Sequence, residues 1–199
     1  MLQLRRSYQT IRALAFFRLS FFLWSLALLS TIVPTDTAKA RSVNKTELAA
    51  LTTVVAEFEK AIASKNFDGM FSAMPPRVWA HLRKAANATD AQLTKALTDL
   101  MTEAYTKVKM ESFSLDLGGA IPKELPDGTP YMLVPTETIV KVVDGDKFAM
   151  RSHTLALMDE GKWYLLRISD PQQIVILTKV YPQYRGVSFP SGSNEMLEE

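Results

Sequence analysis

The chain lacks cysteine altogether and has only two histidines among its 199 residues. Without cysteine it can form no disulfide bond and has no thiol nucleophile. The two histidines, His81 and His153, are far apart in the sequence, which argues against a transition-metal site built from clustered imidazole and thiolate ligands. We therefore expect no metal or other cofactor, and a fold that depends on its hydrophobic core alone.

The chain also has little net charge, and the small excess is unevenly distributed. There are 23 Lys and Arg against 21 Asp and Glu, a net charge of +2. Residues 1–40 hold five of the basic and one of the acidic residues, which leaves 18 and 20 in the remainder and a net charge of −2. A mildly acidic domain offers no electrostatic basis for binding nucleic acid.

The first 40 residues have the organisation of a secretory signal peptide. Four arginines precede an apolar run over 19–33. The small residues Ala38 and Ala40 follow the run at the spacing of a cleavage site. The alternative is an uncleaved membrane anchor over 13–33, but Arg18 interrupts that run. We therefore predict a signal peptide over 1–40 and a periplasmic or secreted mature protein.

We expect residues 41–190 to form one domain that begins with helices. After a capping segment near residue 44, Leu48, Leu51 and Val55 recur at spacings of three and four, as on the apolar face of a helix. Shorter helices are predicted over 67–71 and 76–86, and a longer one follows the capping box at 89–92.

Beyond residue 108 the hydrophobic period changes from 3.6 to 2, which is typical of strands. Phe113, Leu115 and Leu117 alternate with polar residues, and a loop rich in proline and glycine follows over 118–130. Short turns containing Asp and Gly then join three further strands, which predicts an antiparallel meander. These strands are expected over 131–143, 147–158 and 162–169.

The C-terminal region is expected to contain one more helix and a tail. Asp170 can cap a helix and Pro171 suits its first turn, so residues 171–181 are predicted to be helical. Residues 191–199 are polar without a pattern and are predicted to form a flexible tail. The fold class is thus α+β, with N-terminal helices packed on a curved antiparallel sheet.

Three features resemble a known family: the segment AIASKNFDGM at 61–70, the paired hairpins, and GKWYLLRI at 161–168. Together they are similar to the nuclear transport factor 2-like (SnoaL and ketosteroid isomerase-like) superfamily of α+β cones, over about residues 46–170. The resemblance implies a conical sheet around a helix, a pocket at the open end, and frequent dimerisation through the outer sheet face. The superfamily contains both enzymes and binding modules, so the resemblance selects no activity.

The expected strand register divides the sheet into two faces. With three-residue turns, Thr138 lies opposite Ser152 and His153 lies opposite Arg167. The face expected to meet the helices then has apolar residues with threonine and serine hydroxyls, and no Asp, Glu, His or Lys. General acid–base catalysis needs a group that can change charge, so we predict a non-enzymatic module that binds a small apolar ligand, or a cone filled by its own side chains. The candidate cavity-lining residues are Trp79, Tyr105, Thr138, Ser152, Thr154 and Tyr164, and no catalytic residue is assigned.

The opposite face is expected to carry a charged cluster and an apolar patch. The charged cluster would consist of three side chains lying side by side, Glu137, His153 and Arg167. It could be an anion-binding or catalytic site, or a row of solvent-exposed charge pairs across the strands. A patch of four large apolar side chains is seldom left open, so we expect residues 174–181 or a second copy of the chain to cover it. The members of this patch, the interface candidates, are Leu155, Leu157, Trp163 and Leu165.

Two alternative functions stay open at this point. The first is a hydrolase or isomerase of the same fold, with His153 or His81 as the base. The second is a protein-interaction subunit that forms a homodimer through the outer sheet face. In each case we expect no nucleic-acid partner, and no membrane contact once the signal peptide is removed.

Overall fold

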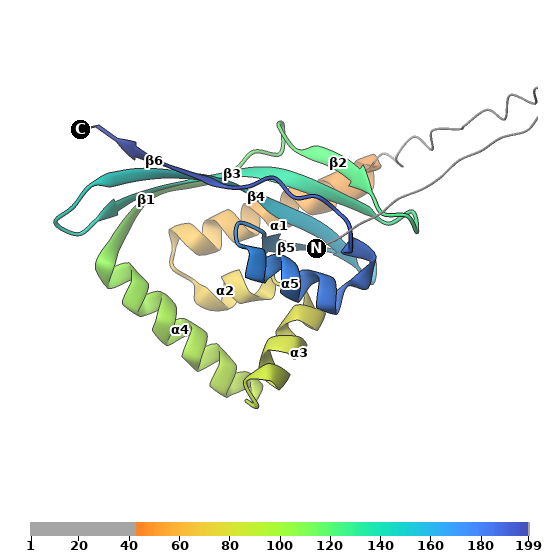
Figure 1. Ribbon diagram of the computed structural model, residues 1–199, viewed down its shortest axis with the longest axis horizontal. Helices are drawn as coiled ribbons and strands as arrows, with labels where there is room; N and C mark the ends of the chain where they lie inside the picture. The colour runs from red at the N-terminus through yellow and green to blue at the C-terminus, as the bar shows by residue number, and fades with distance from the viewer. Residues whose placement is uncertain (1–42, 199) are drawn as a thin grey trace, which may run out of the picture. The chain divides into compact units, whose positions relative to one another are not determined.

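The computed structural model describes residues 43–198, and the predicted signal peptide lies outside the described residues. The described part is α+β, as Figure 1 shows. Its helices are α1 (Lys45–Ala63), α2 (Phe67–Ser72), α3 (Pro76–Ala85), α4 (Asp90–Lys107), α5 (Pro171–Val180) and the short 3-10 helix η1 (Pro182–Tyr184). Its strands are β1 (Val108–Leu115), β2 (Ile121–Glu124), β3 (Pro130–Val142), β4 (Lys147–Asp159), β5 (Lys162–Arg167) and β6 (Ser193–Leu197). Among the described residues, no helix has the length and apolar character needed to cross a bilayer.

Helix α1 begins at a capping box, in which two side chains bond each other's backbone. The Asn44 side-chain oxygen accepts a hydrogen bond from the Glu47 amide at 2.9 Å, and the Glu47 carboxylate accepts one from the Asn44 amide at 2.9 Å. Reciprocal bonds of the same kind start α4 and α5. Each box satisfies amides that the first helical turn leaves without a partner, so these three starts are set by local sequence.

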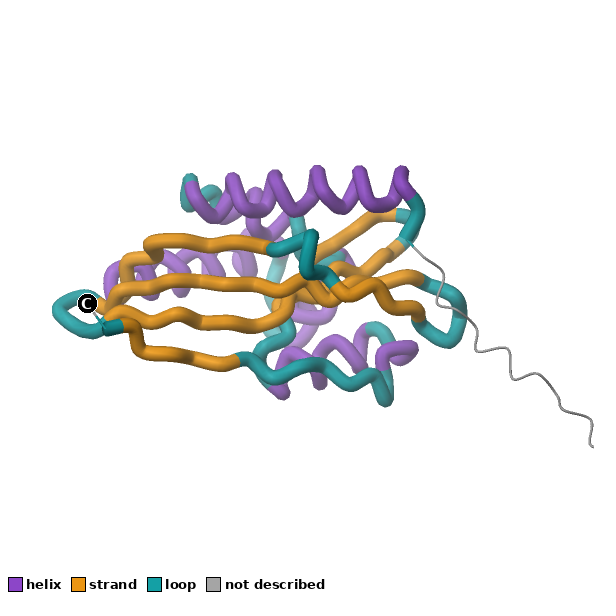
Figure 2. The backbone as a smooth tube through the Cα atoms, turned by 90° about the horizontal axis from the view of Figure 1, so that it is seen from above, coloured by secondary structure: helices purple, strands orange, loops and turns teal. Residues whose placement is uncertain are grey.

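The long strands β3 and β4 form the centre of the sheet, and each pairs with two different neighbours along its free edge. The start of β3 pairs with β2 and its remainder with β1, while the start of β4 pairs with β6 and its end with β5. All of these pairs are antiparallel, and the sheet is strongly curled (Figure 1). In Figure 2 one long helix lies along one side of the strands, and the other helices lie behind the strands and along the opposite side.

The hairpin registers differ from the expected ones. Between β3 and β4, Thr136 rather than Thr138 lies opposite Ser152, because five residues separate the last pair, Lys141 and Lys147. This shift of two residues leaves every side chain of β3 and β4 on its expected face.

The hairpin between β4 and β5 differs in a way that changes the faces. Asp159 pairs with Lys162 across a two-residue turn, in which Glu160 and Gly161 both have positive φ, 50° and 76°. Such a turn, of type I′, matches the twist of the flanking strands. The expected three-residue turn is therefore wrong, and a shift of one residue transfers every side chain of β5 to the opposite face.

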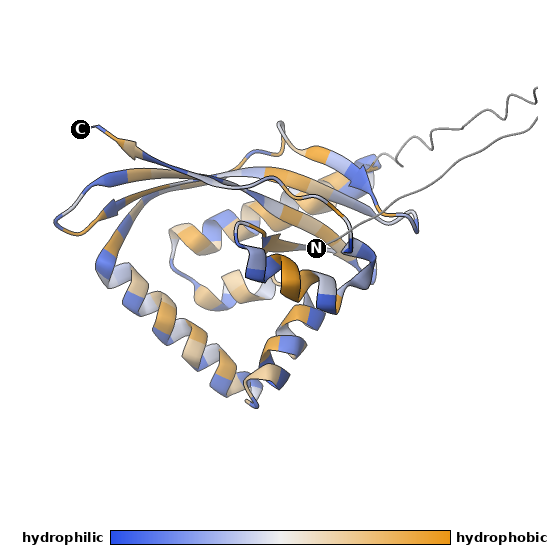
Figure 3. Cartoon of the chain, viewed as in Figure 1, coloured by the Kyte–Doolittle hydropathy of each residue, from blue (hydrophilic) through white to orange (hydrophobic). Residues whose placement is uncertain are grey.

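The two sheet faces pack against different helices. On the inner face, Leu51 and Val55 of α1 pack with Met132, Ala156 and Trp163. On the outer face, a second core joins β3 and β4 to the end of α5 and to η1. Figure 3 shows that the middle of α5 is strongly apolar. The members of the outer core are Val78, Leu125, Tyr131, Leu133, Leu155, Leu157, Ile168, Leu177, Tyr181 and Tyr184.

Two strands occupy regions that were expected to be irregular. Strand β2 lies inside the predicted loop over 118–130 and pairs with β3. Strand β6 lies inside the predicted flexible tail, where Ser193 pairs with Arg151 and Leu197 with Lys147. The expectation of a flexible tail is wrong, because β6 satisfies backbone groups along the edge of β4 that would otherwise be open.

Candidate ligand-binding site

A cavity of 430 Å³ lies between the inner face of the sheet and the helices. Its volume is within the range of small-molecule sites, about 300 to 1,000 Å³. Every helix from α1 to α5 contributes to its wall, together with β1, β3, β4 and β5. The residues that line it are Phe58, Ile62, Met70, Phe71, Met74, Val78, Leu82, Met101, Tyr105, Met110, Phe113, Thr136, Thr138, Thr154, Leu165, Leu166, Arg167, Gln173 and Ile176.

The helical side of the cavity is apolar and rich in methionine. Met70, Met74 and Met101 come from α2, the loop after it and α4, and Met110 adds a fourth methionine from β1. Methionine side chains are unbranched and polarizable, so they adapt to ligands of different outline. This wall can accept an apolar body without fixing its shape closely.

A β-bulge in β1 brings two of its side chains to the same wall. Met110 pairs with Val140 and Phe113 with Thr138, and the register shifts at Glu111 between them. The extra residue allows positions 110 and 113 to face inward, although regular alternation would separate them. The bulge thus enlarges the apolar wall of the cavity.

Three threonines form a polar strip on the sheet side. The hydroxyl of Thr136 donates to the Val134 carbonyl at 3.1 Å, and the hydroxyls of Thr136 and Thr154 are 2.8 Å apart. Because the Thr136 proton is used on Val134, Thr154 is the donor of that pair. Thr138 is a buried residue, and its hydroxyl has no hydrogen-bond partner among the residues that the structure describes.

Two further polar side chains reach the cavity from β5 and the first turn of α5. Arg167 lies opposite Thr154, is exposed, and forms no ion pair with any described residue. The Gln173 side-chain oxygen accepts hydrogen bonds from the amides of Ser169 and Asp170 at 2.8 and 3.1 Å. These bonds fix the orientation of the amide, so its NH₂ group is the part left to donate elsewhere.

The lining contains almost nothing that titrates near neutral pH. Among the described residues that line the cavity, only Arg167 and Tyr105 are ionisable. Burial raises the pKa of the Tyr105 hydroxyl above its ordinary value, and an arginine stays protonated in proteins. Neither side chain is suited to remove a proton from a bound molecule near neutral pH.

Of the six residues predicted to line a cavity, three do so in the structure. Tyr105, Thr138 and Thr154 line the cavity. Ser152 shares the face of Thr154 but does not line the cavity; it borders the groove that also contains His153. Tyr164 packs against the outer core because of the shifted register. Trp79 packs its ring against Phe71 and donates its indole N–H to Asp90 at 2.9 Å.

Sequence reasoning missed the methionine wall and the two donors at Arg167 and Gln173. The methionines come from separate elements, so no local pattern connects them. Arg167 could have been placed correctly by a two-residue turn at Glu160 and Gly161, since a Gly in the second position is typical of type I′ turns.

The charged cluster predicted from Glu137, His153 and Arg167 does not form. Glu137 binds Arg151 at 2.8 Å, and Arg151 also binds Glu195 of β6 at 2.5 Å. Arg167 faces the cavity on the other side of the sheet. The reason is again the shift of one residue between β4 and β5.

His153 instead lies in a polar groove of 430 Å³ on the outer face, opposite Pro135 of β3. Its Nδ1 atom is buried and has no hydrogen-bond partner among the described residues. A general base is usually oriented by a third group, and no described carboxylate performs that role for this imidazole. His81 lies on α3 and is not among the residues that line either space.

The four interface candidates are buried within the chain itself. Leu155 and Leu157 are completely buried, under the end of α5 and η1. Trp163 and Leu165 lie on the inner face with α1, where the Trp163 indole N–H donates to the Glu47 carbonyl at 2.9 Å. The expectation that all four form one outer patch is therefore wrong.

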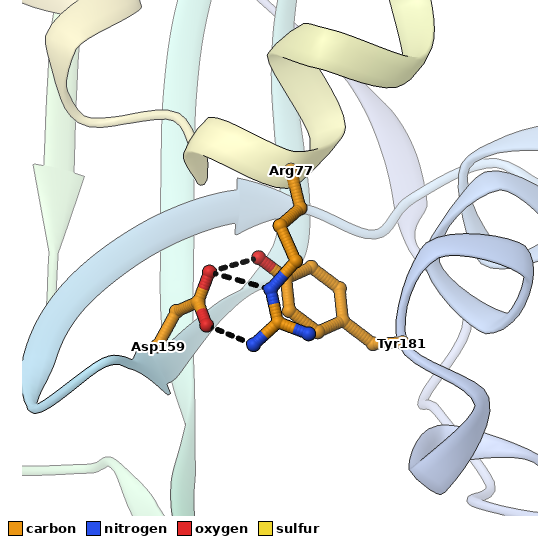
Figure 4. Close-up of polar contacts among 3 residues, drawn as sticks. All are labelled: Arg77, Asp159 and Tyr181. Atoms are coloured by element: carbon orange, nitrogen blue, oxygen red, sulfur yellow. Dashed lines mark hydrogen bonds and ion pairs between the residues drawn. The ribbon is translucent and has the colours of Figure 1, made fainter.

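A buried carboxylate at the end of β4 is joined to a residue of α3 and to the residue that follows α5, as Figure 4 shows. Asp159 is only 4% exposed; it binds the Arg77 guanidinium through both of its oxygens, and it accepts a hydrogen bond from the Tyr181 hydroxyl at 2.7 Å. The guanidinium lies 4.7 Å from the centre of the Tyr181 ring. This cluster holds α3 and the end of α5 in place beside β4.

The pKa values in this cluster follow from its contacts. Burial by itself would raise the pKa of Asp159, but the hydrogen bonds from Arg77 and Tyr181 outweigh it and lower the pKa. Burial and the bond to Asp159 both raise the pKa of Tyr181. The carboxylate is thus charged and fully bonded near neutral pH, which is the state of a structural ion pair.

Comparison of the chain with protein-family models, curated proteins and solved structures gives no match. Within residues 43–198, no group of three or more His, Asp or Glu is arranged to hold a metal ion.

Proposed function

We propose that this protein binds a small, largely apolar molecule in the inner cavity and does not transform it. The observation that carries the proposal is the lining itself. It combines an adaptable apolar wall with a strip of hydroxyls, and no carboxylate, imidazole or lysine of the described chain reaches it. Such a lining can bind and orient a ligand, but it supplies no group for general acid–base catalysis.

We also propose that the chain is exported and that binding takes place in the periplasm or outside the cell. The support is the charge and hydrophobicity of residues 1–40. The finer family assignment, to the nuclear transport factor 2-like superfamily, is likewise a proposal. It is supported by helices packed on a strongly curled antiparallel sheet and by the three sequence features described above.

The binding proposal can be tested with phenylnaphthylamine, a neutral fluorophore whose emission rises in apolar surroundings. We expect saturable binding of one molecule per chain. The variant Thr138→Phe should abolish it, because Thr138 is a buried cavity residue whose hydroxyl has no partner among the described residues, so a ring there fills space without breaking a bond. Aromatic residues also suit a strand.

The matched control is Ile139→Phe, the next residue on β3, whose side chain points to the other face. It adds a ring of the same kind to the same strand, outside the cavity. Equal binding by both variants would place the fluorophore elsewhere on the protein, and no binding by the unaltered protein would refute the proposal. Circular dichroism on both variants checks that each is folded.

A second candidate function is catalysis in the outer groove, favoured by the unpartnered Nδ1 of His153. It ranks second because the neighbouring acid Glu137 is already bound to Arg151. Hydrolysis of an activated ester that disappears in His153→Ala but persists in His81→Ala would favour it. Equal rates in the two variants would exclude His153 as the base for that reaction.

A further inference from the structure

We infer that the ligand of the inner cavity is an amphipathic monocarboxylate, such as a medium-chain fatty acid, whose carboxylate binds Arg167. The inference rests on the proposed function and adds the chemical class of the ligand. It follows from the way polar groups are distributed around the cavity and from the kind of polar group present.

The lining is divided between an apolar part and a polar part. Helices α1 to α4 and strand β1 contribute apolar side chains, apart from the hydroxyl of Tyr105. The polar residues come from adjacent positions of β3, β4 and β5 and from the first turn of α5, since Thr154 pairs with Arg167 and bonds Thr136. A ligand that satisfies both parts has an apolar body and one polar end.

The polar part offers hydrogen-bond donors. Arg167 supplies a guanidinium, Gln173 supplies the NH₂ group left by its bonds to the backbone, and Thr138 supplies a hydroxyl without a partner among the described residues. Thr154 uses its proton on Thr136. Because these donors have no acceptor in the lining, a matching ligand must supply hydrogen-bond acceptors. A carboxylate supplies two acceptor oxygens.

The charge of the site selects an anion with a single charge. Three other arginines of the described chain already have an acidic partner, since Arg77 binds Asp159, Arg83 lies 3.6 Å from Asp90, and Arg151 binds two glutamates. Arg167 has no such acid, and no described acid lines the cavity. One free guanidinium neutralises one carboxylate, and its exposed position lets the head group stay partly in contact with water.

The test compares dodecanoate with dodecanol, which has the same chain and no charge, as competitors of phenylnaphthylamine below their aggregation concentrations. The unaltered protein should bind dodecanoate about tenfold more tightly than dodecanol. Arg167→Met should weaken dodecanoate binding about five- to tenfold and weaken dodecanol binding much less, because an alcohol oxygen carries no charge. Arg167→Lys should retain part of the preference, because it keeps the charge but not the planar fork.

Arg185→Met is the matched control, because Arg185 is exposed and does not line the cavity. If dodecanoate binds no better than dodecanol, or if Arg167→Met and Arg185→Met behave alike, the assignment of the carboxylate to Arg167 is overturned while the cavity still binds the fluorophore. If the unaltered protein binds no fluorophore and neither competitor, the proposed function itself has failed.

Discussion

The two buried tyrosines at the end of α5 and in η1 allow a sharp test of how the outer core is stabilised. Tyr181 and Tyr184 are each 1% exposed. The Tyr181 hydroxyl donates to Asp159 at 2.7 Å, whereas the Tyr184 hydroxyl has no hydrogen-bond partner among the described residues. Replacing either tyrosine by Phe removes one oxygen from the same core. Only Tyr181→Phe also removes a hydrogen bond to a charged acceptor.

Tyr181→Phe should lower the free energy of unfolding at neutral pH by about 1.5 to 2 kcal/mol. Hydrogen bonds to charged groups contribute about 1.5–3 kcal/mol. The lower part of that range applies here, because Arg77 continues to bond both oxygens of Asp159 in the variant. Tyr184→Phe should be neutral or stabilising, by up to about 1 kcal/mol, since it removes a buried hydroxyl without a partner.

The effect of Tyr181→Phe should also depend on pH. The pKa of Asp159 is lowered in the folded chain, so its contribution is complete above the ordinary value of 3.8 and is lost as the pH falls through the lower folded value. Without the Tyr181 bond the pKa is lowered less, so less stability is lost in acid. The difference between the two proteins should therefore shrink at low pH.

Urea denaturation monitored by the fluorescence of buried Trp163 measures both variants at neutral pH and in acid. A cost of Tyr184→Phe equal to that of Tyr181→Phe would refute the reasoning, because volume or packing would then explain both. A loss of unfolding free energy in Tyr181→Phe that stays constant as the pH falls would also refute it.

Two further predictions concern the C-terminal third of the chain. Leu177→Ala should lower the free energy of unfolding in urea by about 2 to 5 kcal/mol, because Leu177 is completely buried in the outer core. Val175→Ala, on the exposed side of α5, should lower it by under about 0.5 kcal/mol. Equal losses in the two variants would contradict this packing. Ending the chain at residue 191 should speed amide hydrogen exchange along β4 at Lys147–Arg151, which pairs with β6, and leave the pairing of β4 with β5 protected; unchanged exchange would show that β6 does not pair in solution.

How much of the fold could be predicted depended on how local the signal was. The helix starts at Asn44, Thr89 and Asp170 are set by side chains within three residues, and the sequence reveals them directly. Strand β6 gave no signal, because Ser193–Leu197 is exposed almost throughout and therefore needs no apolar alternation. Its pairing depends on an edge of β4 more than forty positions away along the chain, at Lys147–Arg151.

The candidate site was less predictable than the fold, because its walls come from nine different helices and strands. The hydroxyls of Thr138 and Thr154 could be placed from strand alternation alone. The methionines could not, since nothing in a helix sequence shows which of its partly buried residues borders an open space. A cavity depends on what the packing leaves unfilled, and that is a property of the assembled core.

The turn between β4 and β5 determines the chemistry of both faces of the sheet. With a three-residue turn, Arg167 would point outward beside His153 and the inner cavity would have no charge. With Glu160 and Gly161 alone in the turn, Arg167 lies on the cavity face of the sheet, and the outer groove keeps Arg151, already bound by Glu137 and Glu195. One residue of turn length therefore separates a neutral apolar cavity from one with a free cation at its polar end, and the preference for an anionic ligand depends on that residue.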